Sequence, residues 1–238
     1  MVGDTTTSSG RALVVFDFET NSLSPANGSV VQVAACHYDP GSGEIRGSYE
    51  RLVNPGAGGI PVRCSKIHGV WPKHVKGKPL WRDMSPEFWG WLLSCPPGPG
   101  GDVVLVGYNS RKFDVPFLLH ETARALRAGA LHDTVRGELR ALDLLPVARA
   151  ALPELANHRQ GTVYEHLFGK EIAGAHTAMG DVVALASILK HPRIQAQLAI
   201  HDPTYNVLEV HSGIFPQQLL GAGSRSRLAM EAFCARIV

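Results

Sequence analysis

Cysteine is scarce in this 238-residue sequence, and its four copies follow no metal-binding or disulfide pattern. Cys36, Cys64, Cys95 and Cys234 lie far apart, and no two of them form a CxxC pair. Zinc sites and small disulfide-stapled domains depend on closely spaced cysteines, so the sequence supports neither class. We therefore expect four reduced thiols, as in an intracellular protein.

Long apolar runs and a strong net charge are also missing. No segment approaches the ~20 apolar residues that a membrane-spanning helix needs. The first ten residues, MVGDTTTSSG, lack the basic start and the apolar stretch of a signal peptide. We expect residues 1–10 to be disordered and the protein to be soluble and intracellular, with no membrane partner. A formal net charge of +2 is too small to argue for nucleic acid by itself.

The order of strand and helix patterns indicates an α/β domain. Hydrophobic residues make up 45% of the chain, enough at this length for a full core. Strands separated by short turns come first and predict an antiparallel meander, and later strands alternate with helices, which predicts a mixed sheet. In the helix predicted over 85–93, Ser85 is expected to be the N-cap, with Pro86 at the first helical position. The other predicted helices are 115–128, 146–151, 162–168 and 176–190, and the predicted strands are 12–18, 30–38, 45–53, 103–107 and 141–144.

Two carboxylates stand near the end of the first strand, in LVVFDFETNSL. Because side chains alternate across a strand, Asp17 and Glu19 point to one face while Phe16 and Phe18 pack on the other. Two like charges in a buried strand are unfavourable unless something compensates them. A single D-x-E is common, and alone it is explained by Lys or Arg partners or by a position beyond the strand end.

Two further acids and a histidine stand near the starts of predicted helices. Asp114 stands at the start of an amphipathic helix, and Asp181 stands in the first turn of an apolar helix, five residues after His176. Singly, each acid is explained by the helix dipole and the histidine by a surface or capping role. Together they suggest a site for Mg²⁺, which takes oxygen ligands. Two such ions stabilise both oxygens of a phosphoryl displacement, and a histidine can take the proton of an attacking water.

In order and context, these residues resemble the DEDDh exonucleases of the DnaQ-like group. The motifs are FDFET, YNSRKFDVPFL and HTAMGD, supported by SKIHGV and by LDLLPVAR, which contains Asp143. The resemblance covers about residues 11–192 and implies an RNase H-like α/β fold, a mixed five-stranded sheet flanked by helices. GTVYEHLFG followed by HTAMGDVVALASI is similar to the three-prime repair exonucleases. Residues 193–238 match nothing assignable and are expected to be a C-terminal extension that packs on the domain, mediates dimerisation or binds a partner.

The resemblance implies a metal-dependent 3′→5′ exonuclease that hydrolyses phosphodiester bonds at DNA 3′ ends and releases nucleoside 5′-monophosphates. Asp17, Glu19, Asp114 and Asp181 would hold two Mg²⁺ ions, with Mn²⁺ as a substitute. His176 would be the general base. The expected substrate is a single-stranded or frayed DNA 3′ end, and a homodimer is left open.

The same resemblance implies contacts to the substrate. Thr20 and Leu23 would touch the terminal nucleotide, with Leu23 as an apolar wedge. Ile67 would stack near the same base, Asn109 would bond the backbone and Arg111 would contact phosphate. For Leu23 and Ile67 the alternative is ordinary packing.

A second, diffuse group of basic residues lies in the middle of the chain, interleaved with Trp71 and Trp81. It is either a surface that tracks phosphates and stacks bases or a solvated loop. Its cations are Lys66, Lys73, Lys76, Lys78 and Arg82.

Two other functions are open on the sequence alone. RNA 3′→5′ exonucleases of the RNase T or oligoribonuclease type share the same acids, and an RNA preference would depend on contacts to the 2′-hydroxyl that the sequence does not locate. A non-catalytic module that binds nucleic-acid ends is the second alternative. The presence of all four acids and the histidine argues against it, because an inactive site has no need to keep them.

Overall fold

A computed structural model describes residues 11–96, 102–131, 139–200 and 202–211. The predicted disordered segment 1–10, Cys234 and most of the predicted C-terminal extension lie outside these ranges. The strands form one six-stranded sheet in the order β3-β2-β1-β4-β5-β6. Their bounds are β1 Arg11–Thr20, β2 Val30–Asp39, β3 Glu44–Leu52, β4 Asp102–Gly107, β5 Leu139–Asp143 and β6 Tyr205–Asn206.

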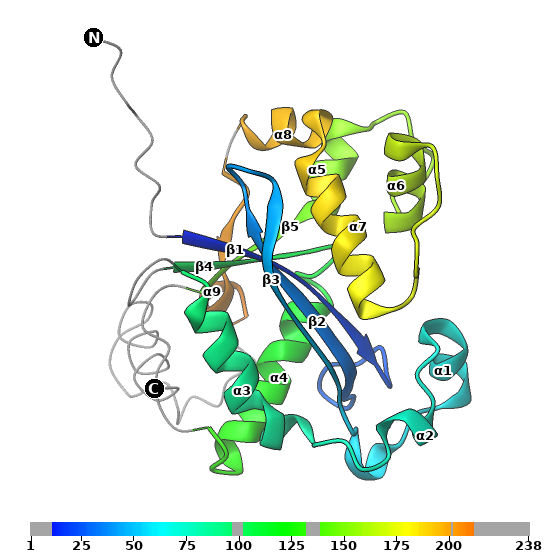
Figure 1. The fold of residues 1–238 in the computed structure, drawn as a ribbon, viewed down its shortest axis with the longest axis vertical. Helices are drawn as coiled ribbons and strands as arrows, with labels where there is room; N and C mark the ends of the chain where they lie inside the picture. Colours follow the sequence, from blue (N-terminus) through cyan, green and yellow to red (C-terminus); the bar gives the residue numbers. More distant parts are fainter. Residues whose placement is uncertain (1–10, 97–101, 132–138, 201, 212–238) are drawn as a thin grey trace.

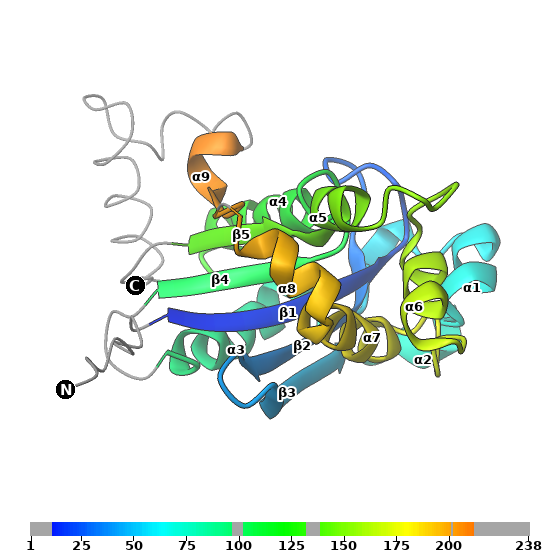
Figure 2. The ribbon, with the colours of Figure 1, turned by 90° about the horizontal axis from the view of Figure 1, so that it is seen from above.

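The sheet is mixed, as predicted. Strands β1 to β3 are an antiparallel meander, β4 and β5 run parallel to β1, and β6 is antiparallel to β5. Figure 2 shows β5, β4 and β1 side by side. The five predicted strands are confirmed, and the sixth is a two-residue strand from the segment beyond residue 192.

Helices cover both faces of the sheet and gather at one of its ends (Figure 1). Helices α3 and α4 pack on one face, and α5, α7 and α8 lie on the other. Helices α1, α2 and α6 lie toward the end of the sheet at which β1 ends. The bounds are α1 Val62–His68, α2 Pro72–Val75, α3 Trp81–Ser94, α4 Asp114–Arg127, α5 Leu144–Ala151, α6 Gln160–Phe168, α7 Ala178–Lys190, α8 Pro192–Leu198 and α9 Val207–Val210, with a short 3₁₀ turn at Gly56–Gly58.

The alternation of β1 divides the core into two layers, as the sequence predicts. Phe16 and Phe18 are buried with the residues of α3 and α4. Val15 is buried in the other cluster, which includes residues of α7. Phe18 packs edge-on against Trp81, with 5.6 Å between the ring centroids. Each of these buried aromatic side chains contributes about 1.5–3 kcal/mol of transfer free energy, so the strand that carries the acids is firmly held.

Helix α3 corrects the predicted helix start. It begins at Trp81, four residues before the predicted N-cap, and Ser85 is a buried residue inside it. Pro86 has no N–H to offer the carbonyl of Arg82. The Ser85 hydroxyl donates to that carbonyl instead, at 3.3 Å, which lets the helix run through the proline. Burial of Trp81 and Met84 explains why the helix extends toward its N-terminus.

The sheet opens at the end of β1. Strand β4 pairs with β1 only as far as Val15 and Val106, so the last residues of β1 have no partner strand on that side. After β4 the chain turns sharply at Gly107, where an added Cβ would lie 2.4 Å from the Cβ of Ser110. Open α/β sheets bind ligands at such carboxyl ends of parallel strands.

Cys36, Cys64 and Cys95 are free thiols. No helix within the described ranges has the length and apolar character needed to cross a bilayer.

Candidate active site

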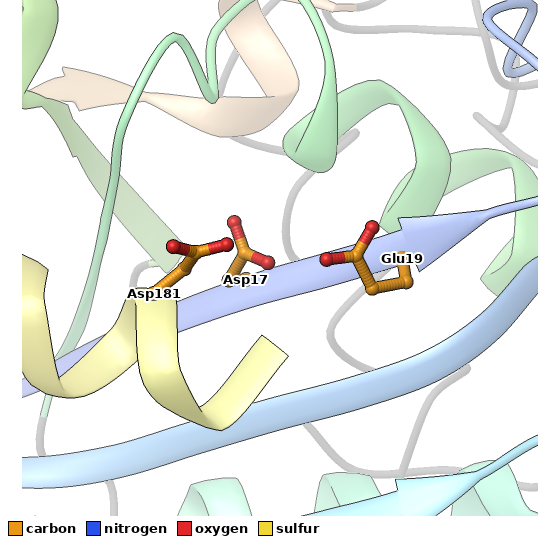
Figure 3. A group of neighbouring side chains, drawn as sticks. All are labelled: Asp17, Glu19 and Asp181. Atoms are coloured by element: carbon orange, nitrogen blue, oxygen red, sulfur yellow. The ribbon is translucent and has the colours of Figure 1, made fainter. Parts of the chain in front are cut away.

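Three carboxylates from two elements meet beside the open end of β1. Asp17 and Glu19 extend from β1, and Asp181 extends from the first turn of α7 (Figure 3). One oxygen from each of the three lies within 4.8 Å of the others. The structure therefore brings together three of the four predicted metal ligands.

Burial and mutual repulsion raise the pKa values of these acids. Burial raises the pKa of Glu19 to about 8, with further contributions from the charges of Asp181 and Asp114. Burial also raises the pKa of Asp17 well above its usual range, and Asp114, Glu19 and Asp181 add to the effect. No lysine or arginine in the described part of the chain counters either shift. Among the described residues, the D-x-E pair therefore has no basic partner that would explain it.

Asp114, the fourth predicted ligand, stands next to this cluster at the first residue of α4. Its side chain is buried, and its Oδ1 accepts a hydrogen bond from the backbone N–H of Phe18 at 3.2 Å. That N–H lies in the part of β1 that β4 leaves unpaired. Burial raises the pKa of Asp114 to about 7, although the hydrogen bond from Phe18 lowers it. Asp114 thus fixes the end of β1 while adding negative charge to the site.

His176 is held close to Asp181 by its backbone. Its φ of 63° is left-handed, and its N–H donates to Asp181 Oδ2 at 3.2 Å. Its side chain is exposed. Thr177 then caps α7, because its Oγ1 accepts from the N–H of Gly180 at 3.1 Å. The predicted start of this helix at residue 176 is thus two residues early, and His176 lies in the loop that leads into it.

Glycine is required at position 180 by the packing of this loop. An added Cβ at Gly180 would lie 2.1 Å from the carbonyl oxygen of Gly174. Gly174 itself has a φ of 73° and accepts a hydrogen bond from Thr177 Oγ1 at 2.7 Å. The glycine in HTAMGD therefore lets the loop that carries His176 lie against the first turn of α7.

Asp143 organises the loop between β4 and α4. Its carboxylate accepts from the backbone N–H groups of Asn109 at 2.8 Å, Arg111 at 3.1 Å and Leu145 at 3.0 Å. It therefore caps α5 and holds the loop that leads to Asp114. The sequence placed Asp143 at a strand end before a helix, which is the pattern of an N-cap, but gave it no role in the site.

The predicted phosphate contact, Arg111, lies against a residue of the C-terminal segment. Its guanidinium carbon is 5.1 Å from the centre of the Tyr205 ring, while the residue remains exposed. Tyr205 belongs to β6 and also contacts the ring of His211. The segment that the sequence left unassigned therefore supports the loop before Asp114. No local signal points to this contact, because 94 positions separate the two residues.

The other predicted substrate contacts differ in their surroundings. Thr20 is buried, and its hydroxyl donates to the carbonyl of Ser22 at 2.7 Å, which fixes the turn after β1. Leu23 is 88% exposed and Ile67 is 63% exposed, so neither is an ordinary packing residue. Asn109 is exposed, with a left-handed φ of 58°.

One of the two tryptophans in the basic group in the middle of the chain does not belong to a stacking surface. Trp81 is buried in the core against Phe18 and Phe88 and cannot stack on a base. Trp71 is 36% exposed.

The donor set fits divalent cations. Carboxylate oxygens are the ligands that Mg²⁺ prefers, and Mn²⁺ accepts the same ligands. Burial and mutual repulsion make the ionised forms of Asp17 and Glu19 unfavourable, and the positive charge of a bound cation would offset both effects. The cluster thus supports divalent-metal dependence.

Two solved structures of exonuclease I share this fold. A solved structure of E. coli exonuclease I in complex with a dA16 oligonucleotide matches with a TM-score of 0.64 at 22% identity, over 80% of this chain and 43% of that chain. Another exonuclease I structure matches with a TM-score of 0.66 at 22% identity, over 80% of this chain and 44% of that one. These likenesses confirm the predicted RNase H-like fold.

Sequence relatives point the same way. "Exonuclease DPD1, chloroplastic/mitochondrial" of Arabidopsis thaliana is 27% identical over 198 residues, 80% of this chain and 58% of that protein. A "DNA polymerase III PolC-type" of Oceanobacillus iheyensis is 30% identical over 176 residues, 74% of this chain and 11% of that protein. This chain therefore spans less than two thirds of the length of either relative. The sequence model of a family described as "Exonuclease" matches residues 14–189, and the chain belongs to that family.

Proposed function

We propose that this protein is a metal-dependent 3′→5′ exonuclease that removes nucleoside 5′-monophosphates from DNA 3′ ends. The observation that carries the proposal is the convergence of Asp17, Glu19 and Asp181 within 4.8 Å, beside the loop of His176. Family membership supports the reaction class.

Asp17, Glu19, Asp114 and Asp181 would hold two Mg²⁺ ions, with Mn²⁺ as a substitute. When bound, such ions stabilise the charge that develops on the attacking and leaving oxygens of a phosphodiester. The all-oxygen donor set of three clustered carboxylates favours these hard cations. One solved E. coli exonuclease I–ssDNA complex is described as a zinc-bound form, which shows that a structurally similar protein accepts a divalent ion.

His176 would act as the general base that takes the proton of the attacking water. Its exposed side chain is free to reach substrate, and the hydrogen bond from its N–H to Asp181 keeps it beside the acids. Burial raises the pKa of Asp181, and the charge of His176 together with the hydrogen bond from its N–H acts against that effect.

Single-stranded or frayed DNA is the substrate we favour. E. coli exonuclease I, which has the same fold, is solved with dT13 and dA16 oligonucleotides, and several relatives are DNA polymerase III proteins. The exposed Leu23 and Ile67 are suited to contact the terminal base. The finer likeness to three-prime repair exonucleases and the homodimer stay predictions.

Matched 5′-labelled single-stranded DNA, duplex DNA and RNA of one sequence test this proposal. We expect Mg²⁺-dependent shortening from the 3′ end, fastest on single-stranded DNA, with nucleoside 5′-monophosphates identified by mass spectrometry. Faster shortening of RNA would replace the DNA assignment with the RNA alternative. Binding of the oligonucleotides without cleavage would favour the end-binding module.

A further inference from the structure

We propose that a groove beside the acid cluster, outside the predicted contacts to the terminal nucleotide, binds the phosphodiester backbone of the substrate strand on the 5′ side of the scissile bond. This inference rests on the proposed exonuclease function. The groove has a volume of about 780 Å³ and lies between α5 and the segment that enters α6. Its polar lining includes Tyr108, Asn109, Arg149, Asn157, Arg159 and Gln160.

The lining carries positive charge without negative charge. Arg149 and Arg159 are both exposed, and no aspartate or glutamate lines the groove. Within the described residues neither guanidinium forms an ion pair, so both are available to a ligand. Arginine binds phosphate through two parallel N–H groups, and the side-chain amides of the lining add neutral donors. The groove therefore suits a chain of phosphate esters.

The wall of the groove is held in place by hydrogen bonds. The Tyr108 hydroxyl donates to the carbonyl of His158 at 2.7 Å, and the His158 ring bonds the carbonyl of Leu152 at 2.9 Å. Thr162 Oγ1 donates to Asn157 Oδ1 at 2.8 Å. A wall fixed in this way loses little conformational entropy when a strand binds.

Two residues of the groove connect it to the segments that carry the acids. Gln160 Nε2 donates to the backbone carbonyl of Asp181 at 2.7 Å. Asn109 belongs to the loop that leads to Asp114, and its N–H is held by Asp143 at 2.8 Å. The groove therefore lies next to two of the segments that carry the acids, the first turn of α7 and the loop before α4.

The direction of the strand follows from the reaction. An exonuclease that removes one nucleotide from a 3′ end has a single nucleotide on the 3′ side of the scissile bond. Any further phosphates bound by Arg149 and Arg159 must then lie on the 5′ side. The groove would hold the remaining strand while the terminal nucleotide is removed.

Kinetics on two substrates distinguish binding of the strand in the groove from a general loss of activity. The first substrate is a 5′-labelled single-stranded 20-mer, which would fill the groove. The second is the 4-nitrophenyl ester of thymidine 5′-monophosphate, which has no nucleotide on the 5′ side. For Arg149→Ala and Arg159→Ala we expect a KM for the 20-mer raised about 3–10-fold each, with kcat for both substrates unchanged. The double variant should also show a weaker salt dependence of binding, by about 0.7 in the log–log slope for each lost phosphate contact.

Arg127→Ala is the matched control, because it removes one exposed arginine from the last turn of α4. It should leave both substrates unaffected. Equal losses on both substrates, or no change in the KM for the 20-mer, would overturn the groove assignment.

Fluorescence anisotropy with the same 20-mer in EDTA keeps the two proposals apart. If the wild-type protein binds the 20-mer but cleaves neither substrate, the proposed function fails. The groove is then judged by binding alone: weaker binding by the double arginine variant supports it, and unchanged binding overturns it.

Discussion

Replacing Glu19 by glutamine should stabilise the metal-free protein while it abolishes catalysis. Glu19 is partly buried beside Asp17 and Asp181, and burial together with the charges of Asp181 and Asp114 raises its pKa from 4.5 to about 8. Folding is therefore opposed by the cost of ionising this carboxyl inside the site. Glutamine has nearly the same shape and carries no charge, so the cost disappears.

The sign and size of this change in the free energy of unfolding follow from the shift in the pKa of Glu19. A pKa raised in the folded state makes no contribution below about pH 4.5, and the destabilisation grows as the pH rises toward about 8. The full shift corresponds to about 3 kcal/mol at pH 7 and about 1 kcal/mol at pH 5. Relaxation of the site and entry of water reduce these figures. We therefore expect Glu19→Gln to raise the free energy of unfolding by about 1–3 kcal/mol at pH 7 and by less at pH 5.

Urea unfolding in EDTA at both pH values measures this effect. The exposed Glu44 of β3 supplies the control, and Glu44→Gln should change the free energy of unfolding by less than about 0.5 kcal/mol. Added Mg²⁺ should stabilise the wild type more than Glu19→Gln, because binding to the folded state adds to stability. A loss of 1 kcal/mol or more in EDTA would refute the reasoning and show that the pair is structural.

Three further variants examine the parts that surround the acids. His176→Ala should lower kcat about 10²–10⁴-fold with unchanged affinity for single-stranded DNA in anisotropy, because it removes only the general base; weaker binding with a normal kcat would contradict this. Gly180→Ala should lower kcat at least about 10-fold without unfolding the protein, because the new Cβ would lie 2.1 Å from the carbonyl oxygen of Gly174 and so displace the loop that carries His176. Alanine favours a helix, so normal kinetics would contradict this explanation. Asp143→Ala should lower the free energy of unfolding by about 2–4 kcal/mol, measured in urea, because three backbone N–H groups lose their acceptor; a loss below about 1 kcal/mol would contradict it.

The fold was largely predictable because its signals are local and repeated. The alternation around Phe16 and Phe18 predicts both β1 and the direction of its acids, and the structure confirms both. The start of α3 was not predictable from Pro86, because the Ser85 side chain replaces the missing backbone donor. Strand β6 has two residues and is defined by its partner β5, so its own sequence carries too little signal.

The site was predictable as a set of acids but not as a complete arrangement. Asp17, Glu19 and Asp181 come together as the motifs indicate. The roles of Asp143 and Tyr205 depend on contacts between distant segments, which spacing along the chain does not encode. The burial of Trp81 was not predictable for a related reason, since a tryptophan beside lysines can face either solvent or the core.

The most direct test of the central claim is a Mg²⁺ titration of 3′-end shortening by the wild type and by Asp17→Asn. The substrate is a 5′-labelled single-stranded oligonucleotide, and circular dichroism confirms that both proteins are folded. We predict that the wild type shortens the substrate from its 3′ end only when Mg²⁺ or Mn²⁺ is present, and that Asp17→Asn is folded and inactive at every concentration. Shortening by the wild type in EDTA, or equal shortening by Asp17→Asn, would contradict the assignment of the acid cluster as a metal-dependent exonuclease site.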